Sequence, residues 1–159
     1  MRLRLATRHD LDQIVDIFNT SRNDPRDGME VEYRKHDFAA YLDATHCLLV
    51  VAYEPAIIGA SGLDYEFLAT ERILGFCLAY DLVTWGFVDI LCVRPEARKM
   101  GIGSELLHWI EDLYDHRWGA IELCYNGYDP QLHQFVRKHG YGEPEDLVWV
   151  SKKLTPREN

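Results

Sequence analysis

The sequence predicts a single α/β domain, and three observations lead to that prediction. The chain has 159 residues, a length typical of one domain with its own core. Strand-like apolar segments are interleaved with segments whose apolar residues recur at helical spacing. No internal repeat, low-complexity tract or linker divides the chain. We therefore expect residues 1–159 to form one domain of mixed strands and helices.

The N-terminal part of the chain predicts a strand followed by a helix. Residues 1–7 alternate charged and apolar side chains, which is typical of a strand and unlike the apolar run of a signal peptide. Thr7 can cap a helix over residues 8–20, with Asp10 at the third helical position and apolar residues on one face. The Asn, Asp, Pro and Gly residues within 21–30 predict a loop.

The middle of the chain predicts a second helix and three strands. The helix is expected over residues 31–44, and apolar strands are expected over 46–53, 73–82 and 87–93. Residues 54–72 contain glycines and a Glu-Pro pair, so either an additional strand or a long loop is compatible with this stretch.

The C-terminal part contains the clearest helical pattern of the chain. Apolar residues recur at helical spacing over residues 103–114, and Gly119 is a candidate terminator. Three further elements follow: a short strand over 120–125, a helix over 130–139 started by Asp129 and stopped by Gly140, and a closing strand over 147–154.

Composition and charge narrow the class of protein. The formal net charge of −9 disfavours nonspecific attraction to nucleic acid or anionic lipid and mildly favours cationic partners. No apolar stretch approaches the roughly 20 residues needed to cross a bilayer. The cysteines lack a CxxC pair, and the histidines form no HExxH or Cys-His cluster. We expect a soluble cytoplasmic protein with reduced core thiols, no metal, and neither a nucleic-acid nor a membrane partner.

The chemistry is concentrated in residues 87–104, where a strand leads into a basic, glycine-containing turn that opens a helix. The first amides of a helix lack intrahelical acceptors and its dipole is positive there, so this junction can bind phosphate. Gly101 and Gly103 leave the approach open, while Arg98 and Lys99 add positive charge. The turn lacks the features of a P-loop and of a dinucleotide-binding fingerprint. A diphosphate compound of another kind is therefore the predicted ligand.

The residues from Arg98 to Gly103 match the Arg/Gln-x-x-Gly-x-Gly/Ala signature of the GNAT N-acetyltransferase superfamily. The run from Asp89 to Arg98 resembles that family's fourth strand and its link to the signature loop, and the order of elements is similar to the family's. The resemblance implies a mixed, mostly antiparallel sheet of about six or seven strands, flanked by about four helices and splayed between strands 4 and 5.

The same resemblance implies a site for acetyl-CoA. The amides of the signature loop and helix start would bind the CoA pyrophosphate, and backbone groups of the fourth strand would pair with the pantetheine arm. The thioester would then lie between residues 89–93 and 120–126, where a backbone N–H could stabilise the oxyanion. The implied cofactor-binding residues are Leu91, Cys92, Val93, Arg98, Lys99, Met100, Gly101, Ile102, Gly103 and Ser104.

Acetyl transfer to an amine needs a base for the amine and protonation or stabilisation of the leaving thiolate. Asp89 stands where some family members carry a Glu that serves as base, although it could equally be an ordinary strand carboxylate. The family often places a general-acid Tyr where this chain has Val136, which cannot donate a proton. Tyr128 is our first choice for the acid. Tyr125 and His133 are the other nearby candidates, and the thiolate could also leave unprotonated.

The implied reaction is direct attack of a primary amine on acetyl-CoA in a ternary complex, with a small-molecule, possibly cationic, or peptide acceptor. Glu30, Glu32, Asp64 and Glu66 would suit a cationic amine, or else form a solvated acidic surface. The alternative is a non-catalytic or regulatory CoA-binding module, which Val136 allows. Exposed edges of the final strands make a homodimer reasonable.

Overall fold

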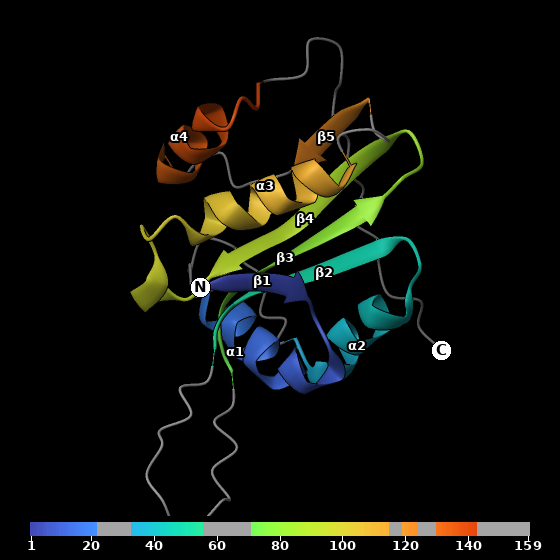
Figure 1. Cartoon of the computed structure of the whole chain (residues 1–159), viewed down its shortest axis with the longest axis vertical. Coiled ribbons are helices and arrows are strands. Elements are labelled where there is room, and N and C mark those ends of the chain that lie inside the picture. The colour runs from blue at the N-terminus through green and yellow to red at the C-terminus, as the bar shows by residue number, and fades with distance from the viewer. Residues whose placement is uncertain (22–32, 56–70, 115–118, 124–129, 143–159) are drawn as a thin grey trace, which may run out of the picture. The chain divides into compact units, whose positions relative to one another are not determined.

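A computed structural model gives the fold of the chain (Figure 1). It describes residues 1–21, 33–55, 71–114, 119–123 and 130–142. The chain divides into two compact units, Met1–Cys124 and Tyr125–Asn159. The first unit contains the sheet and three of the described α-helices, and the second contains one.

The centre of the first unit is a mixed sheet in which the described strands follow the chain order β1-β2-β3-β4-β5. Its neighbours pair antiparallel from β1 to β4, and β4 pairs parallel with β5. The strands are β1 Arg2–Leu5, β2 Cys47–Glu54, β3 Arg72–Asp81, β4 Trp85–Val93 and β5 Ala120–Leu123. The predicted mixed, mostly antiparallel sheet is confirmed, with five strands among the described residues; the closing strand expected over 147–154 lies outside them.

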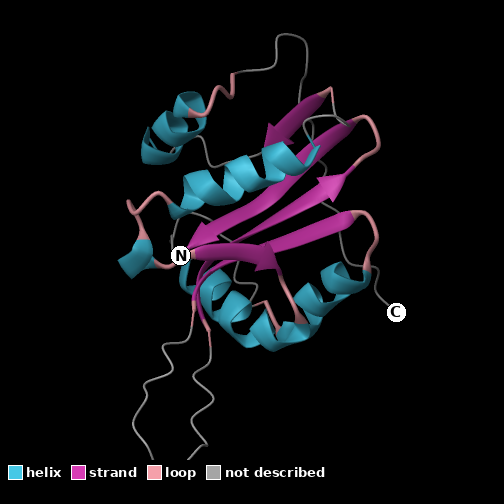
Figure 2. Cartoon of the chain, in the orientation of Figure 1, coloured by secondary structure: helices cyan, strands magenta, loops and turns pink. Residues whose placement is uncertain are grey.

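Helices cover both faces of this sheet (Figure 2). The helices α1 Leu11–Ser21 and α2 Lys35–Asp43 lie on one face, and α3 Ile102–Tyr114 lies on the other. The fourth helix, α4 Pro130–Lys138, belongs to the second unit. The predicted number of about four helices is therefore confirmed.

The core follows from the two-residue period of the strands. Leu49 and Val51 of β2 pack with Phe18 of α1 and Phe38 of α2. Their neighbours on β2 are also buried, on the face that α3 covers with fully buried leucine and isoleucine side chains. The strand β2 is apolar on both faces because the sheet is the middle of three layers, with α1 and α2 on one side and α3 on the other.

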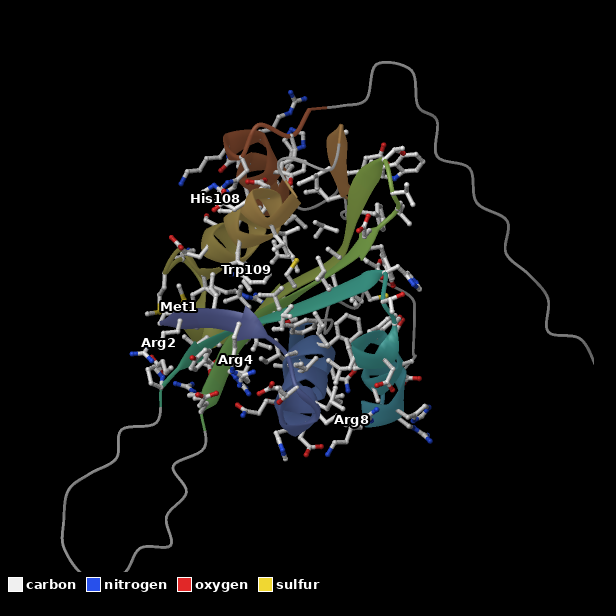
Figure 3. All side chains as sticks on the ribbon, turned by 45° about the vertical axis from the view of Figure 1, so that its right-hand side comes forward. Met1, Arg2, Arg4, Arg8, His108 and Trp109 are labelled. Atoms are coloured by element: carbon white, nitrogen blue, oxygen red, sulfur yellow. The ribbon has the colours of Figure 1, made fainter. Side chains whose placement is uncertain are left out.

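The start of α1 confirms the predicted cap. The Asp10 carboxylate accepts hydrogen bonds from the Thr7 amide at 2.7 Å and from the Thr7 hydroxyl at 3.0 Å. It also accepts two from Arg4 of β1, which lies beside the start of the helix (Figure 3). The first turn, Arg8–Asp10, is a 3₁₀ helix, so the predicted helix over 8–20 is a 3₁₀ turn continued by α1.

The sequence predicts that glycines end two of the helices, Gly119 after α3 and Gly140 after α4. The Gly119 amide donates to the Thr84 carbonyl at 2.9 Å. α3 is described as far as Tyr114 and residues 115–118 lie outside the described residues, so Gly119 stays a predicted helix terminator. Gly140 does act as one: it has φ 81°, and the Tyr141 amide bonds back to the Val136 carbonyl at 3.1 Å. This is the Schellman arrangement, which needs a left-handed residue directly after the helix.

Two expectations from composition can be compared with the structure. Cys47, Cys77 and Cys92 are free thiols, as predicted for core cysteines, and Cys124 lies outside the described residues. Within the described part of the chain, no helix is both long and apolar enough to span a membrane.

Candidate functional site

Among the described residues, the strand β4 is paired along nearly its whole length with β3 but only in part with β5. Its pairing with β3 runs from Gly86 to Val93, whereas its pairing with β5 runs only from Trp85 to Val88. Among the described residues, the second half of β4 therefore has no strand beside it on the β5 side. An unpaired strand edge can take up the amides of an extended ligand.

Asp89 is the first residue of β4 after its described pairing with β5, which ends at Val88. In the β3–β4 ladder Ala79 pairs with Val88 and Leu78 pairs with Ile90, so Asp89 is an extra residue on β4 without a partner opposite it. Such a bulge re-aims the side chain it carries. The Asp89 side chain is exposed, although it lies between positions that are buried or half-buried.

The Asp89 carboxylate has a tyrosine as its hydrogen-bond donor. The Tyr80 hydroxyl donates to Asp89 Oδ2 at 3.1 Å. The pKa of Tyr80 is raised above its ordinary value, first by burial, then by a hydrogen bond with Tyr41, and then by the negative charge of Asp89. Tyr80 consequently keeps its proton and remains a donor at physiological pH.

The chain leaves β4 through a segment that two arginines hold in place. Arg94 donates from Nε to the Ile73 carbonyl at 2.7 Å and from Nη1 to Asp16 at 2.7 Å. In the 3₁₀ turn that follows, Pro95–Ala97, Glu96 accepts a hydrogen bond from Arg72 at 2.7 Å. These contacts attach the segment to both β3 and α1, so the loop that follows starts from a fixed position.

The loop from Arg98 to Gly101 brings backbone amides and positive charge together. Lys99 has φ 64° and Gly101 has φ 83°, both in the left-handed region. These two residues turn the chain between the 3₁₀ segment and the start of α3, and backbone N–H groups in turns of this kind can bind anions. The Arg98, Lys99 and Met100 side chains are exposed, whereas Ile102 is buried and fixes the start of α3.

The space beside this loop is open, and free helix-start amides adjoin it. A Cβ added at Gly101 would meet no atom within 4 Å, so the surface there is open. The first bond of α3 runs from the Glu105 amide to the Gly101 carbonyl at 3.0 Å, and the amides of Ile102 and Gly103 precede it. Open space, helix-start amides and two exposed cations are the donor set that a diphosphate requires.

The structure thus brings most of the predicted site residues onto one continuous path. Leu91, Cys92 and Val93 lie on the β4 segment beyond the β5 pairing, and the residues from Arg98 to Ser104 form the loop and the start of α3. The Cys92 side chain packs toward the core beneath α1 and α2, which leaves its backbone for a ligand. Among described residues no group of three His, Cys, Asp or Glu side chains could hold a metal ion.

The structure describes only some of the predicted acid–base residues. Asp89 is exposed at the bulge, whereas Tyr128 lies outside the described residues. Val136 is buried in α4, with 3% of its surface exposed. Sequence reasoning missed Tyr80. The alternation of the strand over 73–82 places Tyr80 on the face of Phe76 and Leu78, but the bulge that brings Asp89 to it leaves no sequence signal.

The chain is similar in fold to several solved structures. A structure named a probable acetyltransferase has a TM-score of 0.74 at 18% identity, over 99% of this chain and 100% of that one. An aminoglycoside acetyltransferase from an uncultured soil metagenomic sample, solved with sisomicin, has a TM-score of 0.70 at 15% identity, over 97% and 96%. A transcriptional regulator from Bacillus halodurans C-125 has a TM-score of 0.67 at 19% identity, over 95% and 99%.

These likenesses show the fold, and a comparison of sequences adds the family. No curated protein matches the chain in sequence. The Acetyltransferase (GNAT) family matches residues 11–141, a range that includes β4, the basic loop from Arg98 to Gly101 and α3. The chain therefore belongs to the GNAT acetyltransferase family.

Proposed function

We propose that this protein transfers the acetyl group of acetyl-CoA to a primary amine by direct attack in a ternary complex, as one N-acetyltransferase domain over residues 1–159. The family implies acetyl-CoA as co-substrate. The observation that carries the proposal is the position of Asp89, an exposed carboxylate on a bulge of β4, the strand that leads through a 3₁₀ turn into the basic loop from Arg98 to Gly101.

The distance along β4 favours CoA over a simple nucleotide. At about 3.3 Å per strand residue, the segment from Asp89 to Val93 spans on the order of 13 Å before the turn to the loop begins. A ligand held by its diphosphate at the loop needs a long extended arm to reach the carboxylate. In this proposal the backbone of Leu91 to Val93 pairs with that arm, and the amides from Arg98 to Ser104 bind the diphosphate.

The proposed steps assign one task to each group. Asp89 removes a proton from the acceptor ammonium, directly or through water, because only the neutral amine is nucleophilic. A backbone N–H on the unpaired edge of β4 donates to the carbonyl oxygen as negative charge develops on it. Tyr128 is the proposed donor to the departing thiolate. Val136 cannot serve, since it has no ionisable group and is buried.

The proposed acceptors are small-molecule amines, including cationic ones, and peptide amines. One similar structure is an aminoglycoside acetyltransferase with bound sisomicin, which makes aminoglycosides the first group to test. The net charge of −9 is compatible with a cationic acceptor.

Calorimetric titration of acetyl-CoA and CoA tests the cofactor site. We expect micromolar binding that weakens about tenfold or more in Arg98→Glu, where one phosphate contact becomes a repulsion. Gly101→Val should also weaken binding, because it strains a left-handed position and fills the open space. Arg2→Glu, a charge reversal at an exposed residue of β1, is the control and should bind normally. Normal binding by both loop variants would show that the site lies elsewhere.

Thiol release with a panel of amines, aminoglycosides and peptides then tests turnover. Asp89→Asn removes the base without changing its shape, and we expect kcat to fall by roughly 10²-fold or more. An unchanged kcat would remove Asp89 from the mechanism while leaving the cofactor site intact.

A non-catalytic or regulatory CoA-binding module is the second candidate. One observation favours it, namely that the position where the family often has a Tyr is occupied by the buried Val136. One structure of similar fold is a transcriptional regulator. CoA binding without acetylation of any amine in the panel would support this candidate over the enzyme.

A further inference from the structure

Building on the proposed function, we propose that Tyr80 is a positioning residue for the catalytic base: its hydroxyl holds Asp89 at Oδ2 and leaves Oδ1 to accept the proton of the acceptor amine. The hydrogen bond from Tyr80 Oη to Asp89 Oδ2 is 3.1 Å long. It joins β3 to the bulge of β4, so it acts where the ladder itself leaves Asp89 unpaired.

Asp89 needs such a partner because the bulge gives its side chain little other support. The residue is exposed and has no residue opposite it in β3. Tyr80 is its hydrogen-bond donor among the described residues. A carboxylate without this contact would sample several rotamers, and a base that is misplaced by about 1 Å can lose much of its rate.

Tyr80 is well suited to hold the carboxylate because its own ring is held on three sides. The Tyr41 ring packs edge-on at 6.2 Å, and the His46 and Phe87 rings lie nearly parallel to it at 6.3 and 6.4 Å. The Tyr80 hydroxyl also has a hydrogen bond with Tyr41. Removal of the hydroxyl alone should therefore leave the ring and its packing in place.

The groups around Tyr80 leave it as a neutral donor beside a charged acceptor. The titratable side chains near it are Tyr41, His46 and Cys47, together with Asp89 itself. Burial, followed by the negative charge of Asp89, raises the pKa of the Cys47 thiol. Cys47 therefore remains a neutral thiol and does not compete as an ion for the acceptor ammonium.

A double-mutant cycle of Tyr80→Phe and Asp89→Asn tests the proposal with an amine that wild-type protein acetylates. We expect Tyr80→Phe to lower kcat about tenfold, with the KM for acetyl-CoA and the melting temperature unchanged. In the Asp89→Asn background the same change should have no further effect, because the residue that Tyr80 positions is gone. Tyr53→Phe, which removes a tyrosine hydroxyl from the far end of β2 where Arg4 covers the ring, is the matched control and should keep wild-type kcat.

A second measurement does not depend on turnover. In protein with ¹³C-labelled tyrosine, the signal that is absent from Tyr80→Phe identifies Tyr80. We expect the Cζ signal of this ring to shift between wild type and Asp89→Asn, because the hydroxyl then faces a neutral amide instead of a carboxylate acceptor.

The outcomes separate this proposal from the proposed function. An additive loss of kcat in the double variant, or an unchanged Tyr80 signal in Asp89→Asn, would overturn the positioning role. A shifted Tyr80 signal together with wild-type kcat in Asp89→Asn would keep the Tyr80–Asp89 contact but overturn both the base and its positioning. If the wild type acetylates no amine, an unshifted signal overturns the contact, and a shifted one assigns it to a non-catalytic site and so overturns the positioning role.

Discussion

Arg94 and Asp16 form an ion pair between the end of β4 and the middle of α1, with 2.7 Å between Nη1 and Oδ2. The two residues are far apart in the sequence. Because Arg94 also donates to the Ile73 carbonyl, it links three elements at the point where the chain turns toward the loop from Arg98 to Gly101. The position of the loop thus depends on a residue that precedes it and points into the fold.

Arg94→Met should therefore lower both stability and CoA affinity. Met keeps an apolar stem of similar length but leaves the carbonyl of the buried Ile73 without this donor, so we expect a loss of about 2 kcal/mol in urea unfolding. Asp16→Asn keeps the hydrogen bond from Arg94 to the Ile73 carbonyl and removes only a carboxylate that is 58% exposed. It should therefore lower the free energy of unfolding by under about 1 kcal/mol. Equal effects of the two variants would show that the Ile73 contact contributes little.

Asp10 gives a prediction for acid unfolding. Burial alone would raise the pKa of this carboxyl, but hydrogen bonds from Arg4 and Thr7 and the charge of Arg4 outweigh it, so the pKa is lowered. A group with a lowered folded-state pKa stabilises the protein above its unfolded pKa, near 4, and loses that contribution as pH falls through the folded value. Asp10→Asn should cost about 2 kcal/mol at pH 7 and progressively less below about pH 4.

Urea unfolding of wild type and Asp10→Asn across this pH range measures the difference. Asp43→Asn is the control, since its ion pair with Arg8 joins two side chains that are each 64% exposed. That variant should change the free energy of unfolding by less than about 1 kcal/mol. A pH-independent difference for Asp10→Asn would mean that the Asp10 charge contributes nothing to stability.

Val83 should be a position where glycine stabilises the protein. It has φ 73° at the turn between β3 and β4, and 82% of its surface is exposed. A β-branched residue in this conformation costs about 1–2 kcal/mol, and glycine gives back about 0.5–1 kcal/mol through the unfolded chain. We expect Val83→Gly to raise the free energy of unfolding by about 0.5–1 kcal/mol. Thr84→Gly, at a neighbouring position without a positive φ, should lower it.

The sequence predicts most elements of this fold because their signals are local. The cap by Thr7 and Asp10, the apolar alternation of the strands and the glycine stop at Gly140 each depend on residues within one turn or one strand. The turn from Arg98 to Gly101 and the helix after it were predictable for the same reason, since basic residues, glycines and the following helix are contiguous in the chain, while anion binding there stays a prediction.

The remaining features depend on contacts between distant segments. The bulge at Asp89 arises from a register shift against β3, and nothing in the β4 sequence marks it. Lys99 adopts φ 64° because the chain must turn between an anchored 3₁₀ segment and a buried helix start, although lysine has no preference for that region. Tertiary constraints of this kind override local propensity, so sequence reasoning found Asp89 but not the tyrosine that holds it.

Gly75 should control the path of β4 through the proposed cofactor site. A Cβ at this position of β3 would lie 2.7 Å from the Cys92 carbonyl oxygen and 3.2–3.3 Å from atoms of Val93. These contacts include backbone atoms, so Gly75→Ala has to push β4 away from β3 at the segment proposed to pair with the pantetheine arm. We expect a loss of about 1–3 kcal/mol in unfolding and a CoA affinity about tenfold lower.

The matched control for this change is Gly119→Ala, directly before β5. There the added Cβ would lie 3.8 Å from the Thr84 carbonyl oxygen, an ordinary contact, so stability and CoA binding should stay close to wild type. The comparison separates displacement of β4 from a general effect of replacing glycine. If Gly75→Ala is destabilised but binds CoA normally, β4 moves without the ligand following it, and the Leu91–Val93 backbone cannot be what pairs with the arm.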